Sequence, residues 1–126
     1  MKRLVSAICL LLALALFVAW LGSRLGRDVT RMEAYLDRAE DFARDGEWEQ
    51  ARDSLAALEK IWRGAQPLYR ITLEQRILDE ADKNMTRVAA AADNKDKAGF
   101  FMEAASLRSS LEGIARMEKI SWDTVF

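Results

Sequence analysis

The feature that most constrains this chain is an uninterrupted apolar run near its start. Residues 4–22 read LVSAICLLLALALFVAWLG, and Ser6 is the one polar side chain among these 19 residues. At about 1.5 Å of rise per residue, a helix of this length spans about 30 Å, which is the thickness of the hydrocarbon core of a bilayer. The run therefore predicts a membrane-spanning helix.

A cleaved secretory signal is the alternative interpretation of this run. Such a signal has a shorter apolar region and small residues at the −3 and −1 positions of its cleavage site, but here Trp20 and Leu21 occupy the end of the run. We therefore expect an uncleaved signal anchor over residues 1–23, in contact with the lipid bilayer through residues 4–22. A single further domain is expected over residues 24–126.

The positive charges that flank the run nearly balance, so they determine its orientation only weakly. Lys2 and Arg3 precede the run, and Arg24, Arg27 and Arg31 follow it. Basic residues are retained preferentially on the cytoplasmic side of a membrane. Because the N-terminal tail is very short, as in secretory signals, we expect a single-pass cell-membrane protein whose domain is extracytoplasmic (N-in, C-out). The opposite orientation, which would make an intracellular scaffold, is the alternative.

Four small residues fall on one face of the predicted membrane helix. Ala15, Ala19, Gly22 and Gly26 follow one another at spacings of four, three and four. Small side chains allow two membrane helices to approach closely. A homo-oligomer through this face is one interpretation, and the ordinary abundance of Ala in apolar spans is the other.

The composition excludes several classes of site. The chain has no His and one Cys, Cys9, which excludes an internal disulfide, metal sites of imidazole or paired thiolates, and His-based acid–base catalysis. Residues 28–126 carry 15 basic and 20 acidic side chains, a net charge of −5, so electrostatics gives no reason to expect nucleic acid as a partner. We expect no enzyme, no catalytic residue, no cofactor and no bound metal.

Apolar residues recur at alternating spacings of three and four through the rest of the chain, which is the period of an amphipathic helix. The pattern predicts four helices, at about residues 24–45, 47–63, 67–92 and 97–116. Gly46 and Gly64 are expected to end the first two helices, and Pro67 is expected in the first turn of the third. The fold class is therefore all-α: an N-terminal transmembrane helix followed by a small antiparallel helical bundle of two helical hairpins.

An internal repeat is a further possibility that the sequence leaves open. Gly46, Trp48 and Ala51 match the turn of a tetratricopeptide hairpin, but the match is lost at the 34-residue period of such arrays. An offset of 53 residues fits better, since it pairs Gly46 with Gly99 and Trp48 with Phe101. Any two amphipathic hairpins share such positions, so the chain contains either a duplicated hairpin or two unrelated ones. Either case predicts a compact bundle rather than a solenoid.

Five segments of the sequence carry a resemblance to a known family. They are the opening MKRLV with its apolar anchor, GEWEQARDSLAALEKIW, ITLEQRILDEADKNMTRV, NKDKAGFFMEAASLRSSLEGI and EKISWDTVF. Together they resemble the uncharacterised bacterial family called "domain of unknown function 4363" over nearly the full length. The resemblance implies a small single-pass membrane protein and implies no activity. Many members carry a His near the position of Glu74, and this chain does not.

Six residues are candidates for contact with a partner or ligand: Trp48, Trp62, Glu74, Phe101, Trp122 and Phe126. Glu74 stands out because the apolar spacing from Ile71 to Leu78 passes through it. A carboxylate on a buried stripe needs a partner unless it lies at the open end of the bundle. The aromatic residues are expected to fill the core or to present a surface to a partner.

These features predict a membrane-anchored module for protein–protein interaction, with another membrane or envelope protein as its partner. The alternative is an extracytoplasmic sensor or small-ligand-binding domain. Its pocket would lie among Trp48, Trp62, Glu74 and Phe101.

Overall fold

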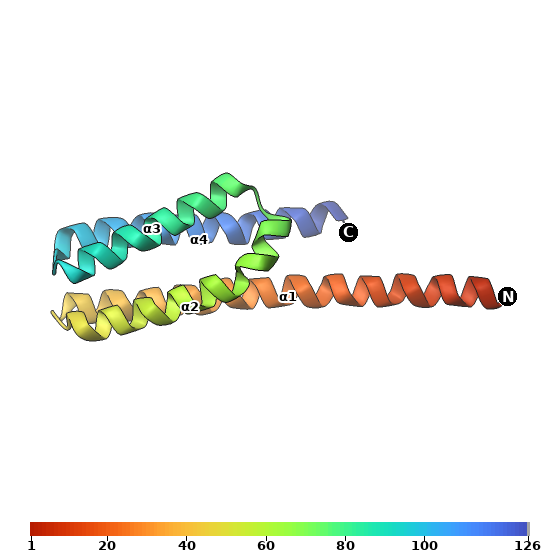
Figure 1. Ribbon diagram of the computed structural model, residues 1–126, viewed down its shortest axis with the longest axis horizontal. Helices are drawn as coiled ribbons and strands as arrows, with labels where there is room; N and C mark the ends of the chain where they lie inside the picture. The colour runs from red at the N-terminus through yellow and green to blue at the C-terminus, as the bar shows by residue number, and fades with distance from the viewer. Residues whose placement is uncertain (126) are drawn as a thin grey trace.

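The chain folds into an apolar N-terminal helix that continues into a bundle of two antiparallel helical hairpins (Figure 1). The computed structural model describes the backbone of residues 1–125 and the side chains of residues 1–20, 27–71 and 73–117. Within these limits all secondary structure is helical: α1 (Lys2–Arg44), α2 (Trp48–Thr72), α3 (Gln75–Asp93) and α4 (Lys97–Val125). The predicted all-α fold class is confirmed.

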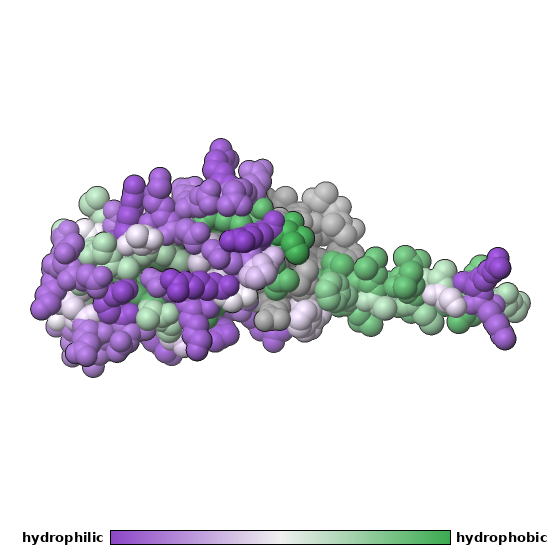
Figure 2. Space-filling model, viewed as in Figure 1, coloured by the Kyte–Doolittle hydropathy of each residue, from purple (hydrophilic) through white to green (hydrophobic). Residues whose placement is uncertain are grey.

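The apolar run forms the first half of α1 and stands clear of the bundle. The stretch Lys2–Trp20 has no buried residues, and Figure 2 shows it as an apolar rod that projects from a largely hydrophilic body. Its length and composition suit a membrane span, and a signal sequence passes the same test. α1 then continues without a break to Arg44, so one helix joins the apolar segment to the bundle.

The core of the bundle is built from one apolar stripe on each helix. In α1 the completely buried residues are Met32, Leu36, Ala39 and Ala43, at the predicted spacings. α1 packs on α2 and α3 packs on α4, while α1 also contacts α4 and α2 contacts α3. The largest fully buried side chains are Trp62, Tyr69 and Phe100. Removal of this apolar surface from water is the main stabilising contribution to the bundle.

The predicted boundary between the second and third helices is wrong. α2 continues through Gly64 and Pro67 to Thr72, and the break lies at residues 73–74. Gly in a helix interior costs only about 1 kcal/mol relative to Ala, whereas continuing the helix buries Ala65 and Tyr69 on the same stripe as Trp62. Burial therefore outweighs the weak helix-breaking tendency of Gly64.

Pro67 lies inside α2 rather than at the start of the third helix. Because Pro has no backbone N–H and its ring crowds the preceding turn, it bends the helix that contains it. Figure 1 shows the last turns of α2 at an angle to the rest of this helix. The predicted end of the fourth helix near residue 116 is also wrong, since α4 runs on to Val125 through a stretch that contains no Gly or Pro.

The two hairpins repeat each other at an offset of 49 residues, not 53. In the first turn the N–H groups of residues 45, 46 and 47 bond to the carbonyls of residues 41, 43 and 42, and each bond recurs 49 residues later. Gly46 and Lys95 occupy equivalent positions with φ of 76° and 54°. Ten pairs of buried apolar residues also match, from Val29 with Leu78 to Ala65 with Ile114.

The offset of 53 is wrong by one helical turn. Apolar stripes repeat about every 3.6 residues, so a slip of four residues still places apolar on apolar. The hydrogen bonds of the two turns, together with the ten buried pairs, fix the register.

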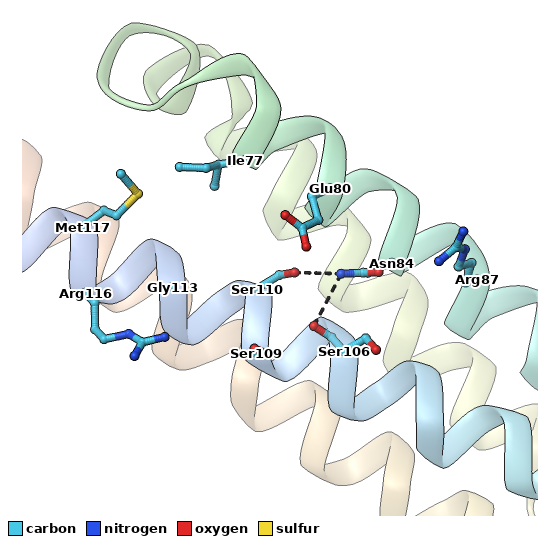
Figure 3. A pocket seen from close by; sticks show the side chains of 10 residues that line it. All are labelled: Ile77, Glu80, Asn84, Arg87, Ser106, Ser109, Ser110, Gly113, Arg116 and Met117. Carbon is cyan, nitrogen blue, oxygen red and sulfur yellow. Dashed lines mark hydrogen bonds between the residues drawn. The ribbon is translucent and has the colours of Figure 1, made fainter.

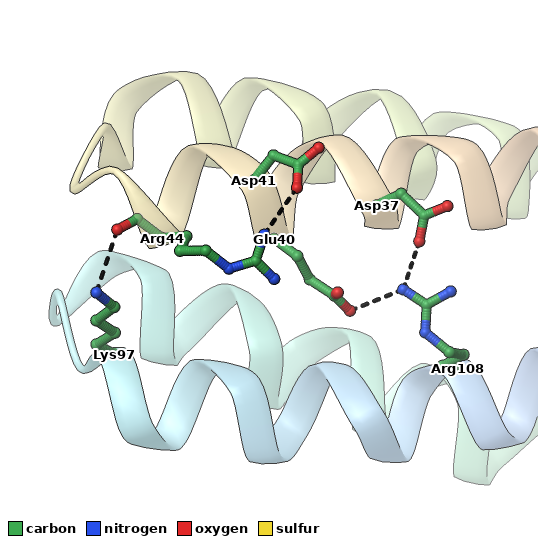
Figure 4. Close-up of polar contacts among 6 residues, drawn as sticks. All are labelled: Asp37, Glu40, Asp41, Arg44, Lys97 and Arg108. Carbon is green, nitrogen blue, oxygen red and sulfur yellow. Dashed lines mark hydrogen bonds and ion pairs between the residues drawn. The ribbon is translucent and has the colours of Figure 1, made fainter.

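Charged side chains join the two hairpins along the contact between α1 and α4 (Figure 4). Arg108 of α4 donates to the carboxylates of Asp37 at 2.6 Å and Glu40 at 2.8 Å, both on α1. Lys97 donates from Nζ to the carbonyl of Arg44 at 3.1 Å. The hydrogen bond with Glu40 raises the pKa of Arg108 above its ordinary value, against a smaller opposing effect of burial, so the guanidinium stays charged at every pH at which the bundle is folded.

Replacing Arg108 with alanine is expected to lower the free energy of unfolding by about 1 kcal/mol, since two partly exposed ion pairs are lost together. Urea unfolding of the full chain in detergent micelles, followed by circular dichroism, measures the change. Lys83→Ala is the control, because Lys83 is exposed and is expected to change stability by less than about 0.5 kcal/mol. Equal effects of the two substitutions would contradict the proposed role of Arg108.

Candidate functional site

A groove of about 740 Å³ runs along the α3–α4 hairpin. All ten residues that line it belong to these two helices: Ile77, Glu80, Asn84, Arg87, Ser106, Ser109, Ser110, Gly113, Arg116 and Met117. Figure 3 shows Glu80, Asn84, Ser106 and Ser110 at the seam between α3 and α4, with Ile77 and Met117 toward the α2–α3 connection. The groove therefore belongs to the second hairpin alone.

The side-chain amide of Asn84 forms the base of the groove and is buried. Asn84 is only 6% exposed. Its Nδ2 donates to Oγ of Ser110 at 2.7 Å and to the carbonyl of Ser106 at 3.4 Å. A buried amide that lost such partners would be strongly unfavourable. These hydrogen bonds therefore hold Asn84 in place and make the seam between α3 and α4 polar where an ordinary helix seam is apolar.

Small residues on α4 make the groove deep enough to receive another group. Ser106, Ser109, Ser110 and Gly113 present almost no side-chain bulk along one face of the helix. A Cβ atom placed on Gly113 would have no atom within 4 Å. An incoming side chain or helix can therefore approach the backbone of α4 closely, as small residues at helix contacts allow.

Charged side chains form the rim of this polar groove. Glu80 and Arg87 extend from α3, and Arg116 extends from α4 (Figure 3). Within the described part of the chain, none of these three forms an ion pair. Both signs of charge are therefore available to an incoming group.

The first hairpin shows that such a groove is not a necessary result of this architecture. At the 49-residue offset, Asn84 corresponds to Tyr35 and Ser110 corresponds to Ile61. Tyr35 and Ile61 are partly buried and pack against the core. The same seam therefore holds a smaller hollow in the first hairpin, about 220 Å³ beside Arg31, Tyr35 and Arg38, and a larger one in the second, although both positions of the glycine pair, Gly64 and Gly113, are retained.

Two of the predicted site residues meet at the end of the bundle that holds the two tight turns. Trp48 and Phe101 both contact Phe100 edge-on, with ring centroids 5.6 Å apart in each pair. The guanidinium of Arg44 lies over the ring of Phe101 at 5.6 Å. Edge-to-face pairs and cation–π contacts of this kind stabilise packing. Trp48 and Phe101 therefore help to join the two hairpins at this end.

Trp62 lies in the core, at the base of a hollow of about 260 Å³ between α2 and α3. It is 2% exposed, its ring centroid is 5.4 Å from that of Tyr69, and its Nε1–H donates to the carboxylate of Asp82. Gln66 donates to the same carboxylate. This indole therefore packs the interior and ties α2 to α3.

Glu74 is exposed at the N-cap of α3, at the opposite end from Trp48 and Phe101. The apolar stripe does not pass through it, because the chain breaks at residues 73–74 and Ile71 is itself 83% exposed. The structure therefore brings Trp48 and Phe101 together but does not bring Trp62 and Glu74 to them. The side chain of Trp122 and all of Phe126 lie outside the described residues.

The lining of the groove is rich in hydrogen-bonding groups. Among the described residues there is no group of three or more His, Cys, Asp or Glu side chains placed to hold a metal ion. Amide, hydroxyl and exposed backbone groups instead offer hydrogen bonds of both kinds. One feature of the sequence indicates this site: Asn84 is a polar residue beside Ala81, Met85 and Val88 on a buried apolar stripe. Asn84 was not among the predicted contact residues.

Comparison with known proteins identifies one similar family. A family model described as "Domain of unknown function (DUF4363)" matches residues 19–125, which cover the end of the apolar segment and the whole of the bundle. Searches among curated proteins and among solved structures found no match.

Proposed function

Since the chain belongs to the DUF4363 family, whose function is unknown, we propose a function from its architecture: a membrane-anchored, non-catalytic module that binds another membrane or envelope protein. The observation that carries this proposal is the groove of about 740 Å³ with polar residues at its base in the second hairpin, where the first hairpin has the larger side chains of Tyr35 and Ile61 and a hollow of only about 220 Å³. A bundle that needed only to be stable would gain from apolar residues at Asn84 and Ser110, as it has at Tyr35 and Ile61.

Anchoring by the apolar segment supports this function. None of Lys2–Trp20 is buried by the bundle, so eleven large apolar side chains would otherwise face water, which is strongly unfavourable. Anchoring in a bilayer also raises the effective concentration of the bundle near other membrane proteins, so modest contacts suffice for association. The continuous helix α1 limits how far the groove can turn relative to the bilayer.

The proposed orientation places the bundle outside the cell membrane. Lys2 and Arg3 at the short N-terminal tail support N-in and C-out. Reporter enzymes fused after Phe126 test this orientation, one active only outside the membrane and one active only inside. Activity of the outside reporter alone is expected, and activity of the inside reporter alone would move the module to the cytoplasm.

The partner is proposed to be a helix with small or polar side chains that lies along the groove. The groove follows the axes of α3 and α4, and its length from Ile77 to Arg87 spans about 15 Å at 1.5 Å per residue. Small residues on α4 permit close approach, and the hydrogen-bonding groups on its floor and rim select a polar partner. A homo-oligomer through Ala15, Ala19, Gly22 and Gly26 remains a second proposed contact inside the membrane.

A sensor or small-ligand-binding domain is the alternative, since a groove of about 740 Å³ is large enough for a small molecule. The groove is open, however, and its lining is about half polar, whereas most small-molecule pockets are enclosed and mainly apolar. A small molecule that raises the Tm of the wild-type chain, but not that of a variant with a blocked groove, would favour the sensor.

Replacing Gly113 with leucine is expected to block the groove and to leave the bundle intact. The new side chain has open space, and loss of a helix-interior Gly stabilises a helix by about 0.5–1 kcal/mol. Native mass spectrometry of the chain extracted in mild detergent is expected to show a complex with a second protein for the wild type and the free chain for Gly113→Leu.

Gly64→Leu is the matched control, because Gly64 is the equivalent residue of the first hairpin and is equally open. It is expected to gain similar stability and to retain the complex. Loss of the complex in both variants, or in neither, would contradict the groove as the contact surface.

A further inference from the structure

The α2–α3 connection lies at the end of the bundle that faces the apolar segment, where the last turns of α4 extend further along α1 (Figure 1). After Pro67 the last turns of α2 cross this end, and residues 73–74 lead into α3 (Figure 1). Because α1 and α2 are antiparallel about a turn at residues 45–47, equal rise per residue puts Pro67 level with about residue 25 of α1. That level is close to the end of the apolar segment at Trp20.

Exposed apolar side chains collect at this end. Within the described part of the bundle, three large apolar residues are exposed: Ile71 at 83%, Met102 at 71% and Met117 at 39%. Ile71 lies on the last turn of α2, and Met117 lies on α4 beside Ile77 (Figure 3). Leu68, Leu73 and Ile77 are partly buried at the same end. Only Met102 lies at the opposite end.

Two exposed arginine residues flank the exposed Ile71 in the sequence. Arg70 and Arg76 are both exposed, one at the end of α2 and the other in the first turn of α3. Within the described part of the chain, neither forms an ion pair. A fully exposed Ile between unpaired Arg side chains is unfavourable in water alone, but matches the boundary between headgroups and acyl chains.

The two ends of the bundle also differ in charge. Residues 27–28, 68–77 and 114–117, near the apolar segment, contain four Arg and two acidic residues. Residues 41–48 and 93–100, around the two tight turns, contain three basic and five acidic residues. Anionic lipid attracts the first end and repels the second.

We infer that the surface formed by residues 68–71 and 73–77, here named the bundle floor, rests on the lipid bilayer, with Ile71 at the acyl boundary and Arg70 and Arg76 on headgroup phosphates. This inference rests on the proposed membrane anchor. The same contact would fix the height and tilt of the bundle, and with them the height above the bilayer of the α3–α4 groove, which runs roughly parallel to α1 (Figure 1).

A fluorescent label at residue 71 tests the inference in the full chain. Cys9→Ala removes the one native thiol, and Ile71→Cys or Met102→Cys then places an environment-sensitive label at either end of the bundle. Both residues are exposed, so neither substitution disturbs the core. The labelled chains are reconstituted into vesicles of phosphatidylcholine and phosphatidylglycerol that contain a quencher attached to lipid headgroups. Flotation of the vesicles in a density gradient then separates the anchored chain from the free chain.

The label at residue 71 is expected to be quenched several-fold more strongly than the label at residue 102, and to be protected from aqueous iodide. Arg70→Glu with Arg76→Glu is expected to remove most of this difference, whereas Lys95→Glu at the opposite end leaves it unchanged. Equal quenching at residues 71 and 102 in chain that floats with the vesicles would contradict contact between the bundle floor and the bilayer, but would not contradict the membrane anchor. A chain that does not float with the vesicles would contradict both the contact and the anchor.

Discussion

Replacing Trp62 with alanine is expected to lower the free energy of unfolding of the bundle by about 3–5 kcal/mol, the range measured for buried aromatic residues. Trp62 is 2% exposed and stacks at an angle on Tyr69. Its removal leaves a cavity between α2 and α3 that no neighbouring apolar residue can fill without moving a helix. The carboxylate of Asp82 also loses the indole N–H and keeps only Gln66 as a donor.

Urea unfolding of the full chain in micelles measures this loss, and two further variants separate its causes. Trp62→Phe keeps most of the apolar volume and loses the hydrogen bond, so its effect is expected to be about 1–2 kcal/mol. Trp48→Ala removes an indole that is only partly buried, so it is expected to cost less than Trp62→Ala. A Trp48→Ala effect as large as that of Trp62→Ala would contradict the central place of Trp62 in the core.

Replacing Leu12 with arginine is expected to release the chain from the membrane. Leu12 lies at the middle of the apolar segment and does not contact the bundle. A charged side chain at the centre of a spanning helix opposes insertion by about 2.5–3.5 kcal/mol, which is a change of about a hundredfold in the insertion equilibrium. The fraction of chain that stays in the membrane pellet after alkaline extraction measures the effect.

Met102→Arg is the control for this substitution, because Met102 is exposed on the bundle far from the apolar segment. It is expected to leave the fraction of chain in the membrane pellet unchanged.

The mass of the chain isolated from membranes distinguishes a membrane anchor from a cleaved signal. The mass of residues 1–126 is expected, and a smaller mass that lacks the apolar segment would show that the segment is cleaved. Full retention of Leu12→Arg would contradict anchoring by this segment.

The apolar stripes were predictable from the sequence because each helix buries one face and exposes the other. Val29, Met32, Leu36, Ala39 and Ala43 lie in the core as their spacing predicts. The ends of the helices were less predictable, because Gly64 and Pro67 are local signals that tertiary burial overrides. The 49-residue repeat was missed for a related reason: periodic stripes cannot distinguish registers that differ by one turn.

The candidate site was the least predictable part of the molecule. The sequence predicts aromatic residues and one acid on an apolar stripe, Glu74, as the contact residues. In the structure Trp62 packs the core and Glu74 lies at the break between α2 and α3. The groove instead depends on two positions, Asn84 and Ser110, where the first hairpin carries the larger Tyr35 and Ile61. This difference becomes visible only when the two hairpins are compared in their true register.

Site-specific photocrosslinking in living cells tests the proposed interaction most directly. A photoreactive side chain replaces Ser109, which is exposed in the groove, and in a second strain replaces Lys60, the equivalent exposed residue of the first hairpin. A discrete adduct with one membrane or envelope protein is expected from residue 109 and not from residue 60, and Gly113→Leu is expected to abolish it. The same adducts from both positions, or no protein adduct from residue 109, would contradict the groove as a site of protein–protein interaction.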